Sequence, residues 1–127
     1  MLHVRETHGS VQEVTQRLEE ATKANKFGVL GTINLTQKMR EKGVEFGPQC
    51  VVIEVCSPVQ AKRVLEATMA ASAALPCRIG VYEEGGKVKV STILPTDMLR
   101  LFDAAGLEPV AREVEETILR IIAAACA

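Results

Sequence analysis

The chain is poor in aromatic residues and carries no excess of charge. Tryptophan is absent, Tyr82 is the only tyrosine, and aromatic residues make up 3% of the 127 positions. This composition excludes the stacking platforms that bind single-stranded nucleic acids. Lys and Arg number 15 against 16 for Asp and Glu, a net charge of -1, so no long-range field attracts phosphates or an anionic membrane. We therefore expect neither nucleic acid nor membrane as a partner.

Long apolar runs and targeting features are also missing. The longest uncharged stretch near a terminus is the short tail 121–127, far below the ~20 residues of a membrane span. The first residues alternate as a strand does and lack the basic start and apolar run of a secretory signal. We therefore expect a cytoplasmic protein. In that compartment the four cysteines, none in a CxxC pair, are expected to be reduced thiols.

Length and composition favour one folded domain spanning residues 1–127. Hydrophobic residues make up 47% and charged residues 24%, as in ordinary globular chains, and this length can bury a single core without staples. No internal repeat or linker appears.

Period-two alternation predicts several strands. The N-terminal strand over 2–7 is expected to turn His3 to solvent. A second strand is expected over 27–35, and its two glycines indicate a bulge or a bend. The run over 49–56 is mostly β-branched and predicts a central strand. The turn Gly85-Gly86 predicts a hairpin between strands near 78–82 and 88–92.

Capping signals predict the helices. Ser10 and Glu13 have capping-box spacing, and Ser57 and Gln60 repeat it with a proline at the first helical position. The helix after Ser57 either continues to residue 74 or breaks near residue 68 into two short helices. The last helix is expected to open at Pro109, and because residues 121–127 are apolar all round, its end suggests a partner surface.

Cys56 is the best-placed reactive group. It closes the central strand directly before a helix start, where free amides and the helix dipole can favour a thiolate. The alternative is inert packing, because Pro58 removes one amide donor and free cysteine is commonly buried.

Cys77, at the start of the next strand, is the second candidate. If two short helices fold the chain back, Cys77 approaches Cys56. If one helix carries the chain across a parallel βαβ unit, the sulfurs lie at opposite ends of the sheet. We interpret Cys50, about 20 Å along the strand from Cys56, and Cys126 as packing residues.

Glu54 is a third candidate because a carboxylate in an apolar strand is costly to bury unless it is paired. One interpretation is a perturbed acid in a pocket. The other, which we favour, is a structural residue that either pairs with a Lys or Arg on a neighbouring strand or lies on an exposed sheet face. His3 and His8 lie far in sequence from any cysteine, and we interpret them as surface residues. No catalytic residue can be assigned.

Several of these motifs resemble a known family. The residues are Glu54-Val-Cys56-Ser-Pro58, then Leu75-Pro76-Cys77, then the strand ending at Tyr82-Glu83, and the Gly86-Lys-Val88 hairpin. Together they are similar to the domain-of-unknown-function family 302, most strongly from about residue 10 to 97. Ser57 and Arg78 stand where members of that family usually carry asparagine.

The resemblance implies an α+β fold with a curved, largely antiparallel sheet and helices on one face, similar to the topology of the TATA-binding protein. It also implies a potential homodimer, and it assigns no activity and no cofactor. Because members without these cysteines exist, the family implies that both thiols are dispensable for folding.

These observations give three hypotheses. The leading one is a non-enzymatic, homodimeric binding or sensing domain in which Cys56 and Cys77, with Glu54 nearby, line a site for a small ligand, a soft metal or an oxidant. The second is a structural or interaction module with inert cysteines. The third, ranked lowest, is a small enzyme with Cys56 as nucleophile.

Overall fold

The computed structural model describes residues 1–127 as five strands, five α-helices and one 3-10 helix. In chain order the elements are β1 (Leu2–Thr7), α1 (Val11–Ala24), β2 (Gly28–Asn34), α2 (Leu35–Glu41), β3 (Cys50–Cys56), α3 (Pro58–Ala67), η1 (Met69–Ala74), β4 (Cys77–Glu84), β5 (Lys87–Ile93), α4 (Pro95–Leu99) and α5 (Leu107–Ala125). None of these helices combines the length and the apolar composition that crossing a membrane requires.

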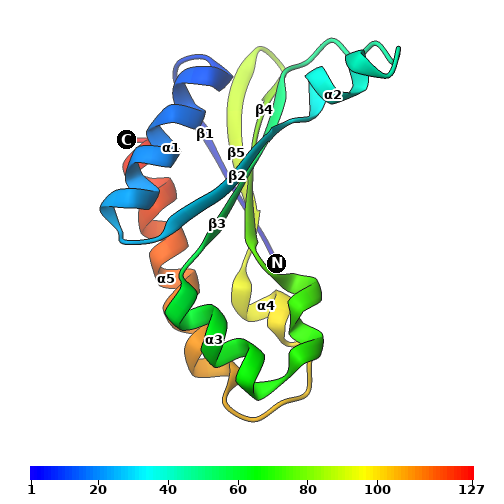
Figure 1. The fold of residues 1–127 in the computed structure, drawn as a ribbon. Coiled ribbons are helices and arrows are strands. Elements are labelled where there is room, and N and C mark those ends of the chain that lie inside the picture. Colours follow the sequence, from blue (N-terminus) through cyan, green and yellow to red (C-terminus); the bar gives the residue numbers. More distant parts are fainter.

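The strands form one sheet in the order β1-β5-β4-β3-β2, and every neighbouring pair is antiparallel. Helices α1 and α5 lie side by side against one face (Figure 1), while α2 lies beyond one end of the sheet and α3 and α4 beyond the other. The opposite face carries no helix, and we call it the open face. The predicted α+β fold with an antiparallel sheet is confirmed.

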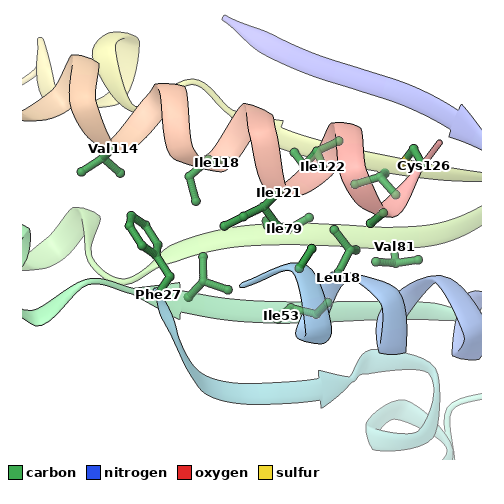
Figure 2. Close-up of a cluster of buried hydrophobic side chains, with 14 of the residues drawn as sticks. Leu18, Phe27, Ile53, Ile79, Val81, Val114, Ile118, Ile121, Ile122 and Cys126 are labelled. Atoms are coloured by element: carbon green, nitrogen blue, oxygen red, sulfur yellow. The ribbon is translucent and has the colours of Figure 1, made fainter. Parts of the chain in front are cut away.

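The core lies between the sheet and the two long helices. Alternate residues of β3, β4 and β5 point toward the helices, among them Ile53, Ile79 and Val81, which are fully buried. Figure 2 shows these side chains meeting Leu18 of α1 and Ile118 of α5. They belong to a cluster of 24 buried hydrophobic residues, so the two-faced alternation of β3 was read correctly.

Local turn signals also match the structure. Gly85 and Gly86 have φ of +60° and +76°, which suits the tight turn of the predicted hairpin. The register of β2 against β3 shifts between Val29 and Gly31, so the predicted bulge is present. The helix after Ser57 breaks at Thr68, whose extended backbone separates α3 from η1.

One of the two predicted capping boxes forms. The Ser10 hydroxyl accepts from the Glu13 amide at 3.1 Å, and the Glu13 carboxylate accepts from the Ser10 amide at 3.0 Å. The second prediction was wrong, because Ser57 makes no side-chain cap bond. The Gln60 side chain lines a cavity beneath α3, and its Oε1 is buried without a hydrogen-bond partner, so it does not reach back to the helix start.

The C-terminal tail is not the exposed surface that its composition suggested. Ile121 and Ile122 are fully buried, and Cys126 is 8% exposed. Figure 2 shows this end of α5 packed over β4 and α1. The Arg17 side chain from α1 donates to the carbonyl of Ala125 at 2.9 Å and so caps the helix end. The large side chains of the tail are therefore buried between α1 and the sheet, whereas Ala123, Ala124 and Ala127 are exposed. The helix also begins at Leu107, two residues before Pro109.

The face of β1 was predicted wrongly. Val4 pairs with Ser91 and His3 pairs with Thr92, and Thr92 is buried on the helix side, so Leu2 and Val4 point to the open face. They are 60% and 45% exposed, whereas His3 is half-buried. The period-two pattern was right, but the apolar side of this edge strand lies where no helix covers it.

Candidate functional site

The fold brings Cys56 and Cys77 to the same end of the sheet. Strand β3 ends at Cys56, the chain returns through α3 and η1, and β4 starts antiparallel at Cys77. Cys77 pairs with Val55, which directly precedes Cys56. The break at Thr68 thus decides between the two geometries left open by the sequence, and the parallel crossover does not occur. Both thiols are free.

Both cysteines line a small cavity between this sheet end and helices α3, α4 and α5. Its volume is about 30 Å³, and 12 of its 16 lining residues are hydrophobic. A space of this size holds a water molecule or a single ion rather than an organic substrate. The lining includes Phe27 from the start of β2 and Val114 from α5, which close the cavity toward the core.

Burial keeps both thiols protonated at neutral pH. It raises the pKa of Cys56, and it raises the pKa of Cys77 to about 11, with the nearby Cys56 charge as a second cause. The dependence of one thiol on the charge of the other shows that the two groups interact. The helix start after Cys56 was expected to favour a thiolate, but desolvation acts in the opposite direction. A nucleophilic role for Cys56 receives no support from this environment.

A third sulfur, which the sequence did not single out, lines the same cavity. Met98 belongs to α4 and joins Cys56 and Cys77 there. Gln60 of α3 also lines the cavity, and its orphaned Oε1 is the one buried polar oxygen there without a partner. Met98 carried no sequence signal, because a methionine on an apolar helix face resembles any core residue. The signal at Gln60 was its capping-box spacing, which does not point to a cavity.

Glu54 is not part of this cavity. It shares the open face with Cys56, and its Oε2 lies 3.6 Å from Nε of Arg78, which pairs with it across β3 and β4. Its Oε1 lies 3.1 Å from where a β-carbon on Gly31 would stand, so the glycine leaves room for the carboxylate. Of the two roles considered for Glu54, the structure places it in the ion pair.

The remaining candidates lie apart from the thiols. Cys50 begins β3, at the opposite end from Cys56, and Cys126 is packed in the core. His3 and His8 are not among the residues that line the cavity. No group of three or more His, Cys, Asp or Glu side chains gathers anywhere in the chain.

A five-stranded antiparallel sheet with two long helices packed on one face defines the class of domain, an α+β sandwich. Residues 3–125 match the family model described as domain of unknown function DUF302. The chain belongs to this family, as the sequence resemblance indicated. It is also similar to the crystal structure of an uncharacterized conserved protein DUF302 from Bacillus stearothermophilus, with 31% identity and a TM-score of 0.92 over 99% of this chain and 98% of that one. No curated protein matches the chain.

Proposed function

We propose that this chain is a non-enzymatic, homodimeric binding or sensing domain, and that its ligand is a soft monovalent metal ion such as Cu(I). The observation that carries the proposal is that Cys56, Cys77 and Met98 all line one cavity. Thiolate and thioether sulfur are the ligands that Cu(I) prefers, and three of them suit its low coordination number. The small volume of about 30 Å³ fits a bare ion.

The raised thiol pKa values agree with binding better than with catalysis. A metal ion binds the thiolate and releases the proton, so a neutral thiol in an apolar cavity still becomes a ligand when the ion is present. A nucleophile or an oxidant sensor must be a thiolate beforehand, and burial of Cys77 opposes that state. Of the soft-metal and oxidant responses considered, the metal is therefore favoured.

The second candidate is a structural module with inert cysteines. It is favoured by the same burial of Cys56 and Cys77, because buried free cysteines act as small hydrophobes. The apolar C-terminal helix end no longer supports this candidate, because Ile121 and Ile122 are fully buried. A cysteine enzyme has less support still, because no histidine lines the cavity.

A competition titration tests the metal proposal. The full chain is purified without oxygen and titrated with Cu(I) against the chromophoric chelator bicinchoninate. We expect one tightly held ion per protomer, lost in Cys56→Ser and in Cys77→Ser and weakened in Met98→Leu. Cys50→Ser is the matched control, because Cys50 is a half-buried thiol on the same strand but outside the cavity.

Two results would contradict the proposal. One is a wild-type chain that gives up all Cu(I) to the chelator. The other is an equal loss of affinity in Cys50→Ser, which would place the ion elsewhere.

A further inference from the structure

The open face of the sheet carries aliphatic side chains beside its charged ones. Antiparallel sheets that face solvent on one side normally carry polar residues there. Here the open face presents a patch of five aliphatic side chains from four strands, which we call the open-face patch: Leu2, Val4, Ile33, Val52 and Ile93. Leu2, Val4 and Ile93 are 60%, 45% and 51% exposed.

Strand β1 provides the most direct sign that this face is covered. Its apolar residues, Leu2 and Val4, point to the open face, while His3, Arg5 and Thr7 point to the side where the helices lie. An edge strand in contact only with its own core would have the opposite alternation. The pattern is that of a strand whose apolar side lies against another surface on the open face.

The charges on the open face are balanced and paired. Lys89 contacts Glu84 at 2.8 Å, and Lys87 contacts Glu6 at 3.2 Å. With the Glu54 and Arg78 pair, three acidic groups meet three basic ones on this face. An identical surface can therefore approach it without net repulsion. A nucleic acid or an anionic lipid would require an excess of positive charge.

The centre of the face is low in relief. Val52, Gly80 and Ser91 follow one another across β3, β4 and β5, and a β-carbon on Gly80 would stand only 3.3 Å from the Ser91 hydroxyl. Small residues in the middle of a sheet allow close approach by another backbone. Strands of about seven residues, at about 3.3 Å per residue, set the length of the sheet, and five strands about 4.8 Å apart set its width. The flat area of the face is therefore roughly 500 Å², and protruding side chains add to the accessible surface. This approaches the ~800 Å² of accessible surface that each partner buries in a standard interface.

We infer that a second copy of this chain docks on the open face, sheet against sheet, with the open-face patch at the contact. The inference rests on the homodimer in the proposed function and identifies its surface. A two-fold axis parallel to the strands and midway between the two sheets would leave each residue at the same height along the strands. The end of the sheet that carries Leu2 and Ile93 would then face the same end of the partner sheet, with these two residues near the rim of the contact. The metal cavity lies at the sheet end beside this contact.

Sedimentation equilibrium of the full chain tests the inference. We expect the wild type to be a dimer, and Val4→Glu and Ser91→Arg to weaken it at least ~100-fold, because each places an unpaired charge in a buried contact. Val59→Glu is the matched control, since Val59 is 73% exposed on α3, away from the open face. It should remain a dimer. Circular dichroism checks that each variant is folded. If Val4→Glu does not fold, Ser91→Arg alone provides the test.

The outcomes separate the surface from the dimer itself. A wild-type dimer that persists in both folded open-face variants overturns the docking surface and leaves the homodimer standing. A wild-type monomer at high protein concentration overturns both. The metal titration is read on variants of Cys56, Cys77 and Met98, none of which belongs to the open-face patch, so its outcome is scored separately.

Discussion

The titration of Cys77 gives a prediction whose size follows from its environment. Burial raises the pKa of this thiol from an ordinary 9.0 to about 11. In the unfolded chain the thiol loses its proton near pH 9, whereas in the folded chain it keeps it until about pH 11. Because the unfolded state then binds fewer protons, the free energy of unfolding falls as pH rises through this window. Two pKa units correspond to about 2.7 kcal/mol.

The assay is urea unfolding of wild type and Cys77→Ala at steps from pH 7.5 to 10.5. The variant loses buried volume and starts less stable, but it has no thiol to titrate at this position. The stability gap should therefore be constant up to about pH 8.5 and should shrink by roughly 2 kcal/mol at the alkaline end. The lysines, Cys50 and Cys126 titrate in both proteins and cancel in the difference. A gap that is unchanged across the whole range would refute the burial argument for Cys77.

Two further predictions concern stability. Ser10→Ala should lower the free energy of unfolding by about 1 kcal/mol, because it removes a formed capping box. Ser57→Ala should lower it by less than ~0.5 kcal/mol, because the Ser57 hydroxyl makes no cap bond. Equal losses for the two variants in urea unfolding would contradict the assignment. Ile121→Ala should lower the free energy of unfolding by roughly 2–5 kcal/mol, because the side chain is fully buried. A change near zero in the same assay would indicate that this end of α5 is exposed.

Most of the fold was predictable because its signals are local. The capping box at Ser10, the Gly85-Gly86 turn and the apolar run of β3 each determine their structure over a few residues. The antiparallel sheet followed from the family resemblance. The break at Thr68 could not be decided from the sequence, because whether η1 continues α3 depends on contacts with α4 that lie far along the chain.

The errors arose where tertiary packing reversed a local pattern. The uncharged end of α5 resembled an exposed surface, but its two isoleucines are buried against α1 and the sheet, and only small alanines such as Ala123 and Ala124 are exposed. The alternation in β1 was read correctly, but alternation alone does not say which face meets the helices. Ser57 and Gln60 have capping spacing, yet Gln60 turns into the cavity instead.

The candidate site was half predictable. Cys56 and Cys77 could be named from their positions at a strand end and a strand start, but their proximity required the antiparallel return. Met98 could not be named, because α4 reaches the cavity only through the packed fold. Glu54 was correctly considered as an ion-pair partner, and the structure supplies Arg78 as that partner.

X-ray absorption at the copper edge, on the Cu(I)-loaded full chain, is the most direct test of the sulfur site. We predict a first shell of sulfur alone, three atoms in the wild type and two in Met98→Leu. A shell that contains nitrogen or oxygen, or one that Met98→Leu leaves unchanged, would contradict a site built from Cys56, Cys77 and Met98.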